Sequence, residues 1–139
     1  MAAAESFTLI DGDRVVPLRA SIDGEAVRIA PDILRDATGW ELKPEGLCQG
    51  DVCVPVRDRA SLRGDHGVDL TAFARALDRP LALDVAARAA ALGTSAAERS
   101  ARLATLEAPD FTLPDLHGRM HTLSAHRGKK ALLIVYASW

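Results

Sequence analysis

Two Asp-Gly steps near the start of the chain place the strongest constraint on its fold. Asp11-Gly12 and Asp23-Gly24 each lie between runs rich in valine, isoleucine and leucine. An Asp-Gly pair between two such runs is typical of a tight hairpin turn, because glycine accepts the backbone conformation that these turns require. The sequence therefore predicts β structure with tight turns over residues 7–30.

Helical and extended patterns alternate after this region. Pro31 suits the first position of a helix, and Gly39 suits the end of one. A residue that precedes a proline avoids the helical region, so the segment that leads to Pro44 is predicted to be extended. The predicted segments are a helix over 32–38, an extended segment over 40–44, a loop over 57–67, and helices over 70–77 and 94–103. Asp69 is expected to cap the helix over 70–77. Thr94 or Ser95 is expected to cap the helix over 94–103, with Glu98 in a capping box. Residues 81–85 fit either a strand or the entry to an alanine-rich segment over 85–92.

Charge and hydropathy exclude several classes of partner. The 139 residues include 17 basic and 19 acidic side chains, and a net charge of −2 gives no electrostatic basis for binding nucleic acid or an anionic membrane. No apolar run approaches the roughly 20 residues of a membrane span. The first residues lack the basic and apolar regions of a secretory signal, so we expect a cytoplasmic protein; a signal trimmed from the chain is the alternative and leaves export open. We expect no cofactor.

Residues 108–139 carry several motifs in a fixed order. The segment opens with Ala108-Pro109-Asp110-Phe111, continues through a hairpin pattern around Gly118 to Arg127-Gly128-Lys129, and ends in an apolar run that leads to Ala137-Ser138-Trp139. Alternation on either side of Gly118 predicts two paired strands. The apolar run over 132–136 is typical of a strand that is buried on both faces.

This order of motifs resembles the beginning of TlpA-like thiol-disulfide oxidoreductases and the related peroxiredoxins, which have a thioredoxin-like fold. The positions that match are scaffold positions: Pro109, Asp110, Phe111, Gly118 and Trp139. The resemblance implies an α/β protein in two parts. We expect residues 1–105 to form an α/β accessory domain of no recognised family, and residues 106–139 to form the first hairpin and the central strand of a thioredoxin-like domain.

In that family the nucleophilic cysteine comes next, so its position would follow Trp139 and this chain holds no catalytic residue of that domain. The resemblance implies that the intact protein reduces disulfides or peroxides, with a thioredoxin-type reductant or a protein disulfide as its partner. The chain alone would then be inactive. Three explanations for its end remain open: a shortened expression product, a degenerate gene, or a selenocysteine codon read as a stop.

A thioredoxin-like segment that stops here would leave the strand over 132–136 without neighbours. An apolar strand with unpaired edges seeks a partner or aggregates. We therefore expect this segment to pack on the N-terminal region, to pair with a second copy in a homo-oligomer, or to be disordered.

Cys48 and Cys53 are the only cysteines of the chain, and they flank a turn predicted at Gly50-Asp51. One interpretation is a disulfide or dithiol that exchanges electrons with a thioredoxin-like centre. A second is a soft-metal site for copper(I), mercury or zinc, with His66 as a further ligand. The third is an inert pair or a structural link. The alternative to an oxidoreductase is therefore a non-enzymatic interaction or soft-metal-binding module that uses Cys48 and Cys53.

Other polar residues give no catalytic pattern. His117, His121 and His126 fit a solvated hairpin and the loop after it, although His117 and His121 can face each other across the turn. Asp110 and Asp115 are expected to act as cap and turn residues rather than as a pair of catalytic carboxylates.

Overall fold

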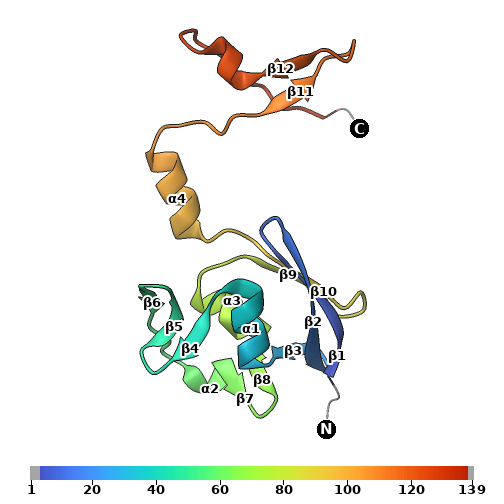
Figure 1. Cartoon of the computed structure of the whole chain (residues 1–139), viewed down its shortest axis with the longest axis vertical. Helices are drawn as coiled ribbons and strands as arrows, with labels where there is room; N and C mark the ends of the chain where they lie inside the picture. The colour runs from blue at the N-terminus through green and yellow to red at the C-terminus, as the bar shows by residue number, and fades with distance from the viewer. Residues whose placement is uncertain (1–3, 138–139) are drawn as a thin grey trace. The chain divides into compact units, whose positions relative to one another are not determined.

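The computed structural model describes residues 4–137, which belong to two compact units, Met1–Ala101 and Arg102–Trp139 (Figure 1). The boundary expected from the sequence, between residues 105 and 106, lies a few residues further along. Helix α4 (Ala96–Ala104) spans the boundary between the two units. Helices and strands occur together throughout, which confirms the general α/β class.

The N-terminal unit (Met1–Ala101) is built on a seven-stranded sheet with the order β7-β8-β3-β2-β1-β10-β9. Its strands are β1 (Ala4–Asp11), β2 (Arg14–Asp23), β3 (Ala26–Ile29), β7 (Arg63–Gly64), β8 (Gly67–Asp69), β9 (Leu81–Asp84) and β10 (Ala89–Leu92). The β1–β10 pair is parallel and the other pairs are antiparallel. Both predicted turns are confirmed, because Gly12 and Gly24 connect these strands with φ of 60°.

The alanine-rich segment forms a β-hairpin, which settles the ambiguity over residues 81–85 in favour of a strand. Strand β10 lies parallel to β1, with Thr8 opposite Ala89, and the Thr8 amide donates to the Arg88 carbonyl over 2.9 Å. Ala90 and Leu92 are buried by this pairing. A free edge on β1 therefore decides the conformation of residues whose own propensities favour a helix.

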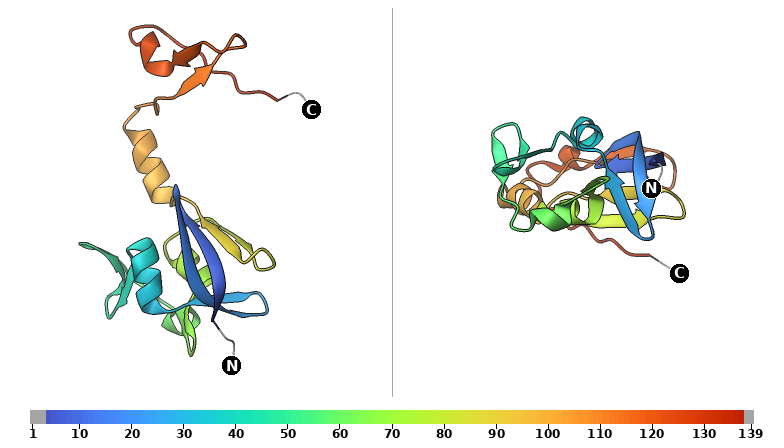
Figure 2. Two further views of the ribbon diagram at one scale, coloured as in Figure 1. Left: turned by 45° about the vertical axis from the view of Figure 1, so that its right-hand side comes forward. Right: turned by 90° about the horizontal axis from the view of Figure 1, so that it is seen from below.

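Helices α1 (Pro31–Thr38) and α3 (Leu70–Ala76) lie beside the large sheet (Figure 2), and their buried side chains complete the core of this unit. Helix α1 ends at Gly39 in the left-handed conformation, and Asp69 caps α3 by accepting from the Ala72 amide over 2.9 Å. Both features agree with the sequence prediction. The largest buried side chains are those of Phe7, Leu9, Ile29, Leu47, Leu62, Leu70, Phe73 and Leu92.

The region 57–67 is not the plain loop that its polar composition suggests. It contains the short helix α2 (Arg59–Leu62) and strand β7. Asp58 caps α2 by accepting from the Ser61 amide over 3.1 Å, and Leu62 is 1% exposed. One buried leucine and one cap therefore order a segment that lacks a periodic apolar pattern.

The C-terminal unit (Arg102–Trp139) contains the predicted hairpin, formed by β11 (Thr112–Pro114) and β12 (Met120–Thr122) and followed by the 3₁₀ helix η1 (Leu123–His126). Gly118 lies in the turn with φ of 79°.

At the start of α4, Ser95 and Glu98 form the predicted capping box. The Ser95 amide donates to Glu98 Oε2, and the Glu98 amide donates to Ser95 Oγ. No helix within residues 4–137 is long and apolar enough to cross a membrane.

The prediction of a buried strand over 132–136 is wrong for this chain. These residues form neither strand nor helix, and the exposed fraction of their side chains runs from 65% at Leu133 to 87% at Val135. A buried strand needs hydrogen-bonding neighbours and a covering layer on each face. The described part of the C-terminal unit offers a single two-stranded hairpin, so neither requirement is met.

Candidate functional site

Cys48 and Cys53 are joined by a disulfide on a second, three-stranded sheet, whose strands are labelled β4, β5 and β6 in Figure 1. Its antiparallel strands are β4 (Glu41–Lys43), β5 (Gly46–Gln49) and β6 (Val52–Val54), with the predicted turn at Gly50-Asp51. The two cysteines lie directly opposite each other on neighbouring strands, with 4.1 Å between their Cα atoms. The spacing of five residues thus becomes a direct cross-strand pair.

The pairing register places the disulfide on the face of this sheet opposite to that of Leu47. Leu42, Leu47 and Val54 form one cross-strand row, and all three pack in or against the hydrophobic core. Residues directly opposite one another share a face, and successive residues alternate between faces. Glu41, Cys48 and Cys53 form the adjacent row on the other face of the sheet, where Glu41 and Cys53 are exposed and Cys48 is buried.

The two cysteines differ in exposure because they occupy different strands. Cys48 lies on β5, the central strand, and is 3% exposed between Glu41 and Cys53. Cys53 lies on β6, an edge strand, and is exposed. The sequence contains no signal for this difference, because it depends on the strand order.

Hydrogen bonds from two side chains connect the three-stranded sheet to helices α1 and α2. The Gln49 side-chain amide donates to the Thr38 carbonyl at the end of α1 over 3.1 Å. The Arg59 guanidinium of α2 donates to the Lys43 carbonyl over 2.7 Å and to the neighbouring Pro44 carbonyl. These hydrogen bonds hold β4 and β5 by contacts that are independent of the disulfide.

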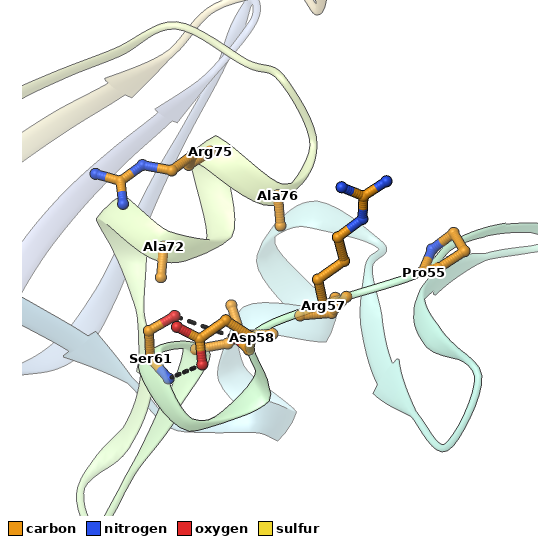
Figure 3. A pocket seen from close by; sticks show the side chains of 9 residues that line it. Pro55, Arg57, Asp58, Ser61, Ala72, Arg75 and Ala76 are labelled. Atoms are coloured by element: carbon orange, nitrogen blue, oxygen red, sulfur yellow. Dashed lines mark hydrogen bonds between the residues drawn. The ribbon is translucent and has the colours of Figure 1, made fainter.

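Strand β6 leads directly into the wall of a cavity of about 340 Å³ (Figure 3). The cavity is lined by Pro55, Val56, Arg57, Asp58, Ser61, Leu62, Ala72, Arg75 and Ala76. Hydrogen bonds from Ser61 hold the pKa of Asp58 below its ordinary value. Figure 3 shows the Arg57 and Arg75 side chains pointing away from each other, so they do not converge on one anion.

The structure gives no support for His66 as a third zinc ligand beside the two cysteines. His66 is exposed on the turn between β7 and β8, in the seven-stranded sheet, whereas the cysteines lie in the three-stranded one. Among residues 4–137 no group of three histidine, cysteine or acidic side chains is placed to hold a metal ion.

Asp115 organises the hairpin of the C-terminal unit to an extent that the sequence analysis missed. Its carboxylate accepts from the amides of His117 and Arg119 over 2.8 and 2.9 Å, and it lies 3.0 Å from His121 Nε2. His117 therefore takes part through its backbone, and His121 faces Asp115. An aspartate whose oxygen reaches amides two and four residues on is typical of a turn, so its position before Gly118 was the available signal.

The hydrogen bond from His121, followed by that from the Arg119 amide, lowers the pKa of Asp115. Because the carboxylate form makes these contacts, we expect them to persist above an ordinary aspartate pKa of about 3.9 and to be lost as the pH falls through the lowered value. An NMR titration of the Asp115 carboxyl carbon measures this. In H121A the midpoint should move upward towards about 3.9; an unchanged midpoint would contradict the assigned cause.

The matching scaffold positions of the C-terminal unit have local roles. Asp110 accepts from the Ser124 amide over 2.8 Å, and hydrogen bonding to Ser124 lowers its pKa. The Phe111 carbonyl accepts from the Leu123 amide over 3.0 Å, and Gly118 provides the turn. Pro109 is exposed before the hairpin, and Trp139 lies outside the described residues.

Comparison with known proteins adds no relative: no family model matches the sequence, and no curated protein or solved structure matches the chain.

Proposed function

We propose that this chain belongs to a thiol- or selenol-based oxidoreductase and that Cys48–Cys53 is a reversible disulfide within it. The observation that carries the proposal is the cross-strand disulfide whose Cys53 is exposed on an edge strand. A thiol partner can reach such a bond without unfolding the core. Because Gln49 and Arg59 anchor β5 and β4, the bond can open while these two strands stay in place.

The motifs of residues 108–139 support the same class of protein. Their order resembles the opening of a thioredoxin-like domain, and the β11–β12 hairpin has the position expected for that opening. On this proposal the reaction partners are a thioredoxin-type reductant or a protein disulfide, and the N-terminal unit positions the partner. The apolar segment 132–136, which is exposed in this chain, would pair with a second copy.

The cytoplasm is the proposed compartment. Disulfides in reducing compartments are usually transient, catalytic or redox-sensing rather than structural. A Cys48–Cys53 disulfide in the cytoplasm would therefore cycle between two states.

A redox titration tests the proposal. The protein is equilibrated in thiol-disulfide buffers of graded potential, its free thiols are trapped, and the mass shift is measured. We expect a two-electron transition between about −180 and −300 mV, which is the range of cellular dithiol proteins. C53S, which cannot form the bond, is the control and should show no such transition.

Two outcomes would overturn the proposal. A midpoint well below about −300 mV would identify a structural link that cellular thiols do not reduce. Stoichiometric tight binding of copper(I) or mercury(II) by the reduced pair, without turnover by thiol partners, would favour the soft-metal-binding module, since two thiolates suffice for these ions.

A further inference from the structure

We infer that Cys53 is the sulfur that exchanges with a partner thiol, and that Cys48 is the internal sulfur that leaves and later closes the bond again. This inference rests on the proposed function and names the order of events at the same site. It separates two sulfurs that the sequence presents as equivalent.

An external thiolate can approach Cys53 more easily than Cys48. An attacking thiolate must approach the sulfur that it will bond to, and it must do so from the side opposite the departing sulfur. Cys48 is 3% exposed on the central strand, with Glu41 paired to it on one side and Cys53 on the other. Within residues 4–137 the strand of Cys53 has one neighbouring strand, and the Cys53 side chain is exposed. An external thiol therefore meets Cys53 first.

The surroundings of Cys48 provide the second argument. Its Sγ lies 4.0 Å from the Gly46 carbonyl oxygen. After reduction the Cys48 thiol can donate to this oxygen, and both burial and this hydrogen bond favour the neutral thiol over the thiolate. A buried neutral thiol is a poor nucleophile towards an external disulfide but remains beside Cys53. This suits the resolving role.

The exchange balances with a dithiol reductant. A thiolate of the reductant attacks Cys53 Sγ, a new S–S bond forms, and the Cys48–Cys53 bond breaks with its electron pair on Cys48 Sγ. Cys48 then takes a proton. The second thiolate of the reductant then attacks the reductant sulfur that is bonded to Cys53 Sγ. Cys53 leaves as a thiolate. Two electrons pass to the pair, and the reductant leaves as its disulfide.

Thiol reactivity of single-cysteine variants tests the assignment. C48S retains Cys53 alone, and C53S retains Cys48 alone. We expect Cys53 in folded C48S to react with oxidised glutathione at least about tenfold faster than Cys48 in folded C53S, because access and thiolate fraction both set the rate. In concentrated guanidinium chloride the two rates should become similar, since burial is then lost.

The reduced wild-type protein provides a second measurement that needs no substitution. Brief treatment with oxidised glutathione followed by acid quenching and peptide mass mapping should place the mixed disulfide on Cys53. Equal or faster reaction of Cys48 in the folded state, or a mixed disulfide located on Cys48, would overturn the assignment. A midpoint potential outside the cellular range would instead contradict the proposed function and leave this ratio of rates unaffected, so the two failures are distinguishable.

Discussion

Replacement of Arg79 by methionine should lower the free energy of unfolding of the N-terminal unit by about 3 kcal/mol, which is the scale for breaking a mostly buried ion pair. The Arg79 guanidinium pairs with Asp11 at the end of β1, and the two side chains are 12% and 13% exposed. It also donates to the Gly93 carbonyl over 2.8 Å and to the Leu92 carbonyl over 3.3 Å. In R79M the Asp11 carboxylate and the Gly93 carbonyl would lose their Arg79 partner at the junction of β1 and β10, whereas the Leu92 carbonyl would still accept from the Gly12 amide.

Arg88 is the matched control for this prediction. It pairs with Glu5 over 2.8 Å, but the two side chains are 56% and 43% exposed. Exposed pairs contribute about 0–1 kcal/mol, so R88M should change the free energy of unfolding by less than about 1 kcal/mol. Denaturant unfolding followed by circular dichroism measures both variants. Equal effects of R79M and R88M would show that the Asp11 pair contributes no more than a surface contact. D11N/R79M should recover part of the loss, because it removes the uncompensated carboxylate.

Replacement of Gly46 by alanine should destabilise the three-stranded sheet by about 3 kcal/mol, the upper range for a strained backbone position. Gly46 has φ of 147°, and a Cβ atom there would lie 2.1 Å from the Val54 carbonyl oxygen of the paired region. This contact is with backbone, so no side-chain rotation can relieve it. Strand β5 must move away from β6, which carries Cys53.

Gly50→Ala is the control for this substitution. Gly50 also has a positive φ, 57°, but nothing lies within 4 Å of its would-be Cβ. Only the conformational cost of about 1 kcal/mol applies there. The free energies of unfolding of G46A and G50A, measured with the disulfide reduced, separate the clash from the strain. A G46A protein as stable as G50A would mean that β5 and β6 do not approach as closely as described.

Local signals in the sequence predicted the local structure of this protein. The Asp-Gly turns, the Gly39 helix end, the Asp69 cap and the Ser95–Glu98 capping box all involve residues within a few positions of one another. The atoms that satisfy one another in such motifs are close in the chain before it folds, so the residue types alone specify the outcome.

Tertiary structure decided what depends on a distant partner. Residues 89–92 became a strand because β1 offered a free edge, whereas residues 132–136 found no such edge and formed none. The sequence placed Cys48 and Cys53 across a turn, but the strand order alone made one central and buried and the other peripheral and exposed. Burial and strand pairing depend on contacts between residues that are far apart in the chain. Patterns among neighbouring residues do not determine those contacts.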